Sequence, residues 1–302
     1  MEAAIRIGTR QSPLALWQAN TVKSLLEAQG HNCVLVPINS QGDLNLEQPL
    51  YELGVVGVFT KTLDAALLAD KIDVAVHSMK DMPTALPKGI ALAAVLERAD
   101  SHDILVHKGT DFLNGEGTIA TGSLRRKAQW LHKYPNHEVV GLRGNVQTRL
   151  QKLKDNPWNG AIFAKAGLAR VDLLPEKYHQ LDWMIPAPAQ GAVAVVAKEK
   201  DSQLLEDCKA INDQNTALCT HIERQFLRTL EGGCTAPIGA IAKVENEQIH
   251  FKGSLHSLDG SQAKLIEQTA PLEQANELGA SLAEALLADG GTEIMEAIRK
   301  EL

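Results

Sequence analysis

The chain has 302 residues, of which 44% are hydrophobic and 22% charged, a composition typical of a globular protein with two or three domains. The net charge of −7 argues against a polyanion-binding protein, and no apolar run approaches the ~20 residues that span a bilayer. We therefore expect neither a nucleic-acid nor a membrane partner. The N-terminus lacks the pattern of a signal peptide and the four cysteines form no CxxC pair, which favours a cytoplasmic location without disulfides or structural zinc.

Strand and helix patterns alternate along the first hundred residues. Residues 4–8 predict a strand, and Ser12 followed by Pro13 is a typical start for a helix that ends at Gly30. The segment 39–57 is polar, contains glycines and is too long for a simple connection. The alternation predicts a mostly parallel sheet covered by helices. The other elements expected here are strands at 33–38, 74–76 and 90–96 and a helix at 60–69.

The segment Asp73–Pro83 is the most informative part of this region. Its apolar run reads as a buried strand, and four polar residues follow within five positions: His77, Ser78, Lys80 and Asp81. Ligands of open α/β sheets bind at the carboxyl ends of strands, so the Asp81 carboxylate is a candidate for chemistry. On this segment alone, a solvated turn is the slightly simpler interpretation.

Basic residues concentrate in the middle of the chain. Residues 101–195 carry 12 basic and 8 acidic side chains, and five of the eleven arginines lie between positions 125 and 170. Arginine pairs bidentately with carboxylates or phosphates, whereas compensation of helix dipoles would place cations at helix C-termini. We therefore favour a ligand with several acidic groups over a solvated surface. The expected strands lie at 104–106, 118–120, 138–142 and 161–164, and the helices after them contain Arg125 with Arg126, Arg149 and Arg170.

The segment Pro186–Gly191 is rigid, and the apolar run 192–197 after it could return to the first lobe as a strand. Two crossings between lobes predict a two-lobed α/β protein with a ligand cleft. An α+β segment is expected beyond them. From residue 201 onwards, the predicted elements are helices at 201–212 and 216–229, strands at 238–244, 248–254 and 264–269, and a helix at 272–288.

Glu231–Pro237 places Cys234 after two glycines, which permit tight turns and close backbone approach. Such a cysteine could be a nucleophile, a point of covalent attachment or simply a small loop residue. The residue types alone leave these alternatives open.

Seven segments, in order along the whole chain, form a pattern together: Thr9–Ala15, Val76–Asp81, Ser123–Arg126, Leu142–Val146, Ala166–Leu168, Gln190–Ala192 and Leu230–Cys234. Each segment is a weak signal by itself, but seven in the same order form a specific pattern. This pattern resembles the porphobilinogen deaminase (hydroxymethylbilane synthase) family of tetrapyrrole biosynthesis.

The resemblance implies an α/β fold of two periplasmic-binding-protein-like lobes of type II and a small C-terminal α+β domain. Lobe 1 would comprise residues 1–98 with 193–212, lobe 2 residues 99–192, and the third domain residues 213–302. The resemblance also implies a monomer that acts on the small molecule porphobilinogen and needs no metal.

The resemblance further implies a dipyrromethane cofactor, attached through a thioether to Cys234, and Asp81 as the catalytic carboxylate. The cofactor would contact Lys80, Asp81, Ser123, Arg125, Arg126, Arg143 and Gly144, and the substrate would contact Arg10, Ser12, Arg143, Arg149, Arg170 and Gln190.

The implied reaction joins four porphobilinogen units, releases ammonia at each addition and ends with hydrolysis to a linear tetrapyrrole. Acetate and propionate groups on each unit would explain the arginines. Loss of ammonia leaves an electron-poor azafulvene, and attack by the terminal pyrrole then puts positive charge on that ring. A single carboxylate, Asp81, could stabilise both cations and help to move protons.

The chain departs from the usual family pattern in five places. Gly54–Gly57 lacks the lysine common in that glycine-rich loop, and Lys61-Thr62 lacks a glutamate. Gly122 replaces a frequent serine, Lys165 a small residue and Ala189 a glycine. These differences bear on lid closure and polar contacts, and they leave the acid, the arginines and the attachment cysteine in place.

The main alternative is a non-catalytic two-lobed protein that binds a polycarboxylate, since the lobes and the arginines would suit it. A cytosolic effector-binding regulator is a weaker alternative, because no helix-turn-helix segment precedes the lobes. A metal enzyme could be built from His77, His102, Asp103 and His107, but their spacing fits no defensible ligand set.

Overall fold

The computed structural model describes residues 4–39, 60–230 and 236–301. These residues divide into two compact units. The first contains residues 4–39, 60–99 and 191–217, and the second contains the described residues from 100 to 190 and beyond 217. The chain therefore leaves the first unit after Ala99 and re-enters it at Gly191, as the two predicted crossings require.

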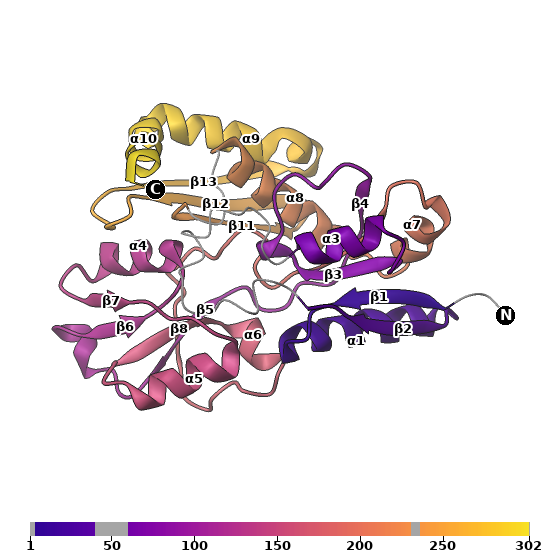
Figure 1. The fold of residues 1–302 in the computed structure, drawn as a ribbon. Helices are drawn as coiled ribbons and strands as arrows, with labels where there is room; N and C mark the ends of the chain where they lie inside the picture. The colour runs from indigo at the N-terminus through magenta and orange to yellow at the C-terminus, as the bar shows by residue number, and fades with distance from the viewer. Residues whose placement is uncertain (1–3, 40–59, 231–235, 302) are drawn as a thin grey trace. The chain divides into compact units, whose positions relative to one another are not determined.

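The first unit is built on a five-stranded sheet with the order β2-β1-β3-β10-β4. Figure 1 labels β1, β2, β3 and β4 of this sheet. Strands β2, β1 and β3 pair in parallel. Strand β10 lies between β3 and β4 and runs antiparallel to both. The apolar run after the second crossing thus returns to the first sheet, as predicted, but it makes the sheet mixed rather than mostly parallel. The strands are β1 (Ile5–Thr9), β2 (Cys33–Pro37), β3 (Val74–Ser78), β4 (Ile90–Val95) and β10 (Val193–Lys198).

Helices α1 (Pro13–Ala28) and α7 (Ser202–Lys209) cover one face of this sheet, and α3 (Lys61–Leu68) packs on β1 and β3. Val74 and Val76 belong to the apolar cluster under α1 and α7. Because side chains alternate along a strand, His77 points to the opposite face of the sheet. Ser78 lies on the same face as Val74 and Val76, under α1, and His77 lies on the other face.

The second unit contains another five-stranded sheet, with the order β7-β6-β8-β5-β9. Strand β6 is parallel to β7 and β8, and β5 is antiparallel to both of its neighbours, so the arrangement repeats that of the first sheet. The strands are β5 (Asp103–His107), β6 (Thr118–Ala120), β7 (Glu138–Val140), β8 (Gly160–Ala164) and β9 (His179–Gln180), and the helices are α4 (Leu124–Lys133), α5 (Val146–Asp155) and α6 (Lys165–Ala169).

The C-terminal part is an antiparallel meander, β11-β12-β13, covered by helices. Phe226 and Phe251, with ring centroids 5.1 Å apart, lie at the centre of its apolar cluster. The strands are β11 (Ile238–Glu245), β12 (Gln248–His256) and β13 (Ala263–Pro271), and the helices are α8 (Gln214–Thr229), α9 (Ala275–Leu286) and α10 (Thr292–Glu301). Together with the two sheets, this meander confirms the predicted α/β fold with an α+β C-terminal part.

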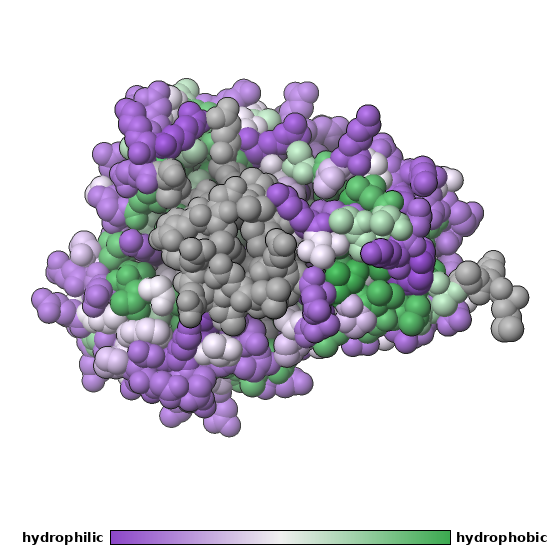
Figure 2. Space-filling model, viewed as in Figure 1, coloured by the Kyte–Doolittle hydropathy of each residue, from purple (hydrophilic) through white to green (hydrophobic). Residues whose placement is uncertain are grey.

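Hydrophilic side chains dominate the surface over α5 and over α10 (Figure 2). Large apolar side chains reach the surface in the first unit, among them Leu68 on α3 and Leu92 on β4. Within the described ranges, no helix combines the length and the hydropathy needed to cross a membrane.

Candidate active site

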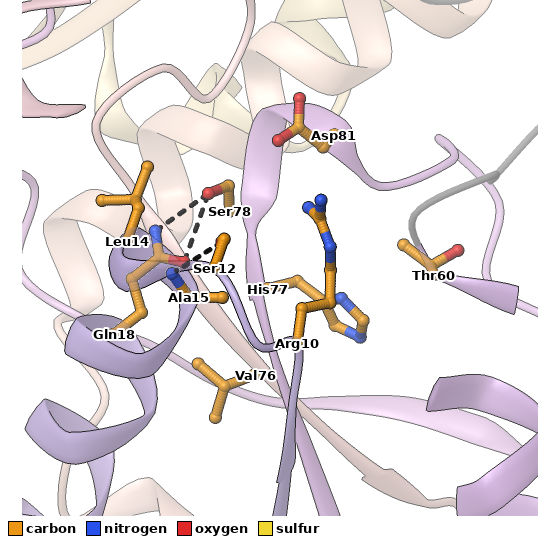
Figure 3. Close-up of a pocket in the computed structure, with 10 residues that line it drawn as sticks. All are labelled: Arg10, Ser12, Leu14, Ala15, Gln18, Thr60, Val76, His77, Ser78 and Asp81. Carbon is orange, nitrogen blue, oxygen red and sulfur yellow. Dashed lines mark hydrogen bonds between the residues drawn. The ribbon is translucent and has the colours of Figure 1, made fainter. Parts of the chain in front are cut away.

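A pocket lies at the carboxyl ends of β1 and β3, which are parallel neighbours in the first sheet. This is the position at which open α/β sheets bind ligands. Figure 3 shows the side chains around it, which come from the turn after β1, the first turns of α1, the end of β3 with the turn after it, and the residue before α3. The pocket is lined by Arg10, Ser12, Gln18, His77, Ser78 and Asp81, among others.

Arg10 and Ser12 belong to the connection between β1 and α1. Ser12 caps the helix as predicted, because its Oγ accepts a hydrogen bond from the Ala15 amide at 3.3 Å. In Figure 3 the Arg10 guanidinium extends from the turn into the space between Asp81 and Thr60. A cation beside a helix N-terminus makes this corner of the pocket suitable for an anion.

Asp81 ends a single 3-10 turn, η2 (Met79–Asp81), directly after β3. Met79, the first residue of the turn, and Met82, which follows it, are both buried, and the Met79 amide donates to the carbonyl of Ala192 at 3.1 Å. These anchors leave Lys80 and Asp81 half-buried, with Asp81 at the pocket. Within the described residues, the Asp81 carboxylate has no hydrogen bond or ion pair, and it lines the pocket.

Two further polar residues of the pocket, Gln18 and Ser78, form a pair that the sequence analysis did not identify. The Gln18 amide nitrogen donates to Ser78 Oγ at 2.9 Å, and Gln18 is only 2% exposed. This bond ties the end of β3 to α1. The spacing of Gln18 from Ala15, Ala19 and Val22 places it on the buried face of the helix, and this spacing is the signal that could have revealed it.

His77 is buried beneath Arg10 in Figure 3. Burial, with the nearby Arg10 charge, lowers the pKa of His77 to about 4. The imidazole is therefore neutral at physiological pH.

In the second unit, the carboxyl ends of β6 and β7 bring two predicted loops together. A side chain at Gly122 would begin 2.5 Å from the carbonyl oxygen of Leu142, so the backbones lie in direct contact. Ser123 caps α4 through the Arg126 amide at 3.4 Å, and Gly144 adopts a φ of +115° just before α5. These loops place Ser123, Arg143 and Gly144 at the carboxyl edge of the second sheet, and Arg149 follows in the first turn of α5.

Arg125 and Arg126 are bound internally, which the sequence analysis did not predict. Both pair with the fully buried Asp103, each through a shortest contact of 2.7 Å. The Gln190 side chain donates to the same carboxylate at 2.9 Å. Two guanidinium groups against one carboxylate leave this cluster of Asp103, Arg125 and Arg126 with a net positive charge.

Arg143 and Arg170 are half-buried cations. Burial lowers the pKa of both, to about 10 for Arg170, which ends α6. A partly desolvated guanidinium gains from an anionic ligand, because the ligand restores favourable charge interactions that burial removes.

The other predicted features are not placed. Cys234 and the Gly54–Gly57 loop lie outside the described residues. In the described ranges, no group of three or more His, Cys, Asp or Glu side chains could hold a metal ion.

Comparison with known families gives two matches. Residues 5–206 match the porphobilinogen deaminase dipyromethane cofactor binding domain, and residues 217–288 match the C-terminal domain of the same enzyme. Together these matches span most of the chain. This chain belongs to the porphobilinogen deaminase family.

Whole-chain relatives agree with this assignment. A porphobilinogen deaminase of Syntrophotalea carbinolica is 42% identical, with 98% of this chain and 96% of the relative covered. A porphobilinogen deaminase of Chloroherpeton thalassium is 39% identical, with 100% and 99% covered. Among solved structures, a periplasmic substrate-binding protein of an ABC transporter from Coxiella burnetii is 14% identical with a TM-score of 0.44, and covers 70% of this chain and 94% of that one.

The residues present fit the dipyrromethane cofactor of the porphobilinogen deaminase family. The cofactor carries carboxylates, and the second unit offers the net positive cluster around Asp103 and the half-buried Arg143 and Arg170. Residues 217–288 match a C-terminal domain of their own, and the two five-stranded sheets form the predicted α/β fold.

Proposed function

We propose that the chain is a hydroxymethylbilane synthase that condenses four porphobilinogen molecules head to tail, with release of ammonia. The observation that carries this function is the relationship over the whole chain to porphobilinogen deaminases, at about 40% identity. It does not support the alternative of a non-catalytic binding protein. When bound, the dipyrromethane supplies the pyrrole to which the first substrate is joined.

In this proposal Asp81 is the catalytic carboxylate. Departure of ammonia from the substrate leaves a positive charge spread over its pyrrole ring, and a carboxylate close to the ring nitrogen stabilises that charge. Asp81 fits the role because its carboxylate faces the pocket without an ion pair to the other described residues. The same group can accept the proton that the ring loses after carbon–carbon bond formation.

The proposal assigns the basic residues to carboxylates. Arg10 and Ser12 would bind substrate in the first unit, where the helix N-terminus adds to their effect. In the second unit the cations lie at the carboxyl edge of the sheet or beside it, and Gln190 contacts them through Asp103. The cofactor would contact Lys80, Asp81, Ser123, Arg125, Arg126, Arg143 and Gly144, and the substrate would contact Arg143, Arg149, Arg170 and Gln190.

The proposal also covers organisation and location. We assign lobe 1 to residues 1–98 with 193–212, lobe 2 to residues 99–192 and the third domain to residues 213–302. We propose a cytoplasmic monomer without nucleic-acid or membrane partners, in keeping with the acidic net charge.

Replacement of the proposed acid tests the function directly. We expect Asp81→Asn to fold and keep its cofactor but to lose turnover of porphobilinogen by at least about a hundredfold, the scale of acid–base and charge stabilisation. Release of ammonia and formation of hydroxymethylbilane are measured under saturating substrate. The matched control is Asp111→Asn, an exposed aspartate in the second unit, which should retain full activity. Near-normal turnover of Asp81→Asn would contradict the assignment.

Mass spectrometry tests the attachment of the cofactor. The denatured wild-type protein should be heavier than its sequence by one dipyrromethane, and Cys234→Ser should lack this adduct because serine cannot form the thioether. Cys219→Ser, which changes a buried cysteine of α8, is the control and should keep the adduct. An adduct that survives in Cys234→Ser would place the attachment elsewhere.

A further inference from the structure

His77 is a polar side chain of the pocket to which the proposed function gives no task. It occupies β3, one residue before Ser78, and is 5% exposed. Its imidazole lies beneath the Arg10 guanidinium and lines the same pocket as Asp81 (Figure 3).

The Nε2 atom of His77 is fully buried and has no hydrogen-bond partner among the described residues. Buried polar atoms are nearly always paired, and an unpaired one destabilises the folded state. In His137, which is about equally buried, both ring nitrogens have hydrogen-bond partners. His137 Nδ1 accepts from Trp130 Nε1 at 3.2 Å, so its Nε2 carries the proton and donates to the Gly115 carbonyl at 3.1 Å. In this respect His77 differs from His137.

Charge around the pocket defines what His77 can offer to a ligand. A protonated imidazole would lie next to the Arg10 cation in a desolvated place, which disfavours protonation. A neutral imidazole keeps one N–H donor and one acceptor nitrogen. Any carboxylate that pairs with Arg10 approaches this ring, and a carboxylate has lone pairs for several donors.

We propose that His77 is a substrate-binding residue whose neutral imidazole donates an N–H to the carboxylate that Arg10 binds. The inference rests on the proposed function, because it takes a carboxylate of porphobilinogen as the ligand. Arg10 follows β1 and His77 belongs to the neighbouring strand β3, so donors from two adjacent strands would fix the orientation of the carboxylate. This orientation would set where the pyrrole ring lies relative to Asp81.

Three substitutions of one residue test this role. His77→Phe keeps the size of the ring and removes both nitrogens, and it should raise the KM for porphobilinogen about tenfold or more, the loss expected for a hydrogen bond to a charged group. The kcat should change less than the KM. His77→Asn retains a donor near the position of Nδ1 and His77→Gln one near Nε2. One of these two variants should have a KM close to the wild-type value, and that variant identifies the donor nitrogen.

Two controls separate binding from packing. His137→Phe removes a buried histidine outside the pocket and should lower the melting temperature while leaving the KM unchanged. If both residues hold one carboxylate, the KM effects of His77→Phe and Arg10→Gln should be smaller together than the product of the two single effects.

The outcomes are distinct. Wild-type protein that consumes no porphobilinogen would remove the proposed function and this inference together. If the wild type is active, an unchanged KM in His77→Phe, or failure of both Asn and Gln to recover it, overturns the role of His77 alone. If His77→Phe does not fold, His77→Leu serves with the same expectations.

Discussion

Two residues at the second crossing, Ala189 and Gly191 on either side of Gln190, have positive φ angles of +62° and +89°. The left-handed region costs an L-residue about 1–2 kcal/mol but is open to glycine. Ala189 is the residue that stands where the family usually has glycine, so this chain carries backbone strain there. Ala189 is held by a hydrogen bond from its amide to the buried carboxylate of Glu223 at 2.6 Å.

We expect exchanges at these two positions to have opposite effects on stability. Ala189→Gly should raise the free energy of unfolding by about 0.5–1 kcal/mol, because relief of strain exceeds the entropy cost of glycine. Gly191→Ala should lower it by about 1–3 kcal/mol, since its Cβ would lie 2.5 Å from the Ala99 carbonyl oxygen. Urea unfolding of both variants at pH 7 measures the two changes. If both substitutions changed the free energy of unfolding in the same direction, the backbone would have relaxed at one of the two sites.

Single residues show how far sequence patterns determine a site. The pattern placed Arg10, Ser12 and Asp81 correctly at strand ends, because strand-end positions follow from local sequence. It could not show that Arg125 and Arg126 pair with Asp103, since that contact joins residues more than twenty positions apart. In the sequence, Asp103 at the start of β5 looks like any other polar residue. Only the packing of α4 shows that its carboxylate is buried and paired.

At the scale of elements, α6 begins unfavourably. Its first residue is Lys165, although helix N-termini disfavour cations. The Lys165 ammonium compensates by binding Asp100 at 2.7 Å, and it also donates to the Gln180 side chain at 2.9 Å. Asp100 also accepts from the His102 amide at 2.9 Å. The ion pair thus fastens the start of the second unit to α6, which ends at Arg170.

We expect Asp100→Asn to lower the free energy of unfolding by about 0.5–1 kcal/mol at pH 7, the range for partly exposed ion pairs. Burial raises the pKa of Asp100, but hydrogen bonds from Lys165 and His102 outweigh it and lower the pKa to about 2. The pair therefore stabilises the protein above the unfolded pKa of about 4 and loses this effect as the pH falls towards 2.

Urea unfolding of wild type and Asp100→Asn at pH 7 and pH 3 measures the difference between them. It should shrink at pH 3, where the folded wild type has begun to lose this contribution. Asp111→Asn is the control and should match wild type at both pH values. A difference independent of pH would show that charge is not the cause.

Most elements followed from hydrophobic periodicity and caps, and the exceptions have physical reasons. The predicted helix after Ser12 is α1, and the predicted run 192–197 is β10. Strand β9 has two residues, too few to show an alternating pattern. Helix α10 was not predicted; it is separated from α9 by a kink at Gly290, whose φ is +94°. The mixed order of both sheets depends on pairing between distant segments, which no local pattern encodes.

At the scale of the whole molecule, each unit buries a histidine that lacks a partner for one nitrogen among the described residues. These are His77 in the first unit and His256 in the second. Burial lowers the pKa of His256 to about 4, with further contributions from His132, whose ring centroid is 5.3 Å away, and from Arg125. Both units should therefore respond to acid in the same direction.

A histidine with a folded pKa near 4 and an unfolded pKa near 6.5 takes up its proton only on unfolding between these values. Its contribution to stability is complete above pH 6.5 and falls by about 1.4 kcal/mol per pH unit as the pH drops towards 4. We expect His256→Phe to remove this pH dependence from the second unit, so its stability should fall less between pH 7 and pH 5 than that of wild type. Urea unfolding across this range measures the slope. His179→Phe, a change of an exposed histidine on β9, should keep the wild-type slope. Parallel curves for wild type and His256→Phe would mean that His256 is protonated equally in the folded and unfolded chains, and that acid sensitivity arises elsewhere.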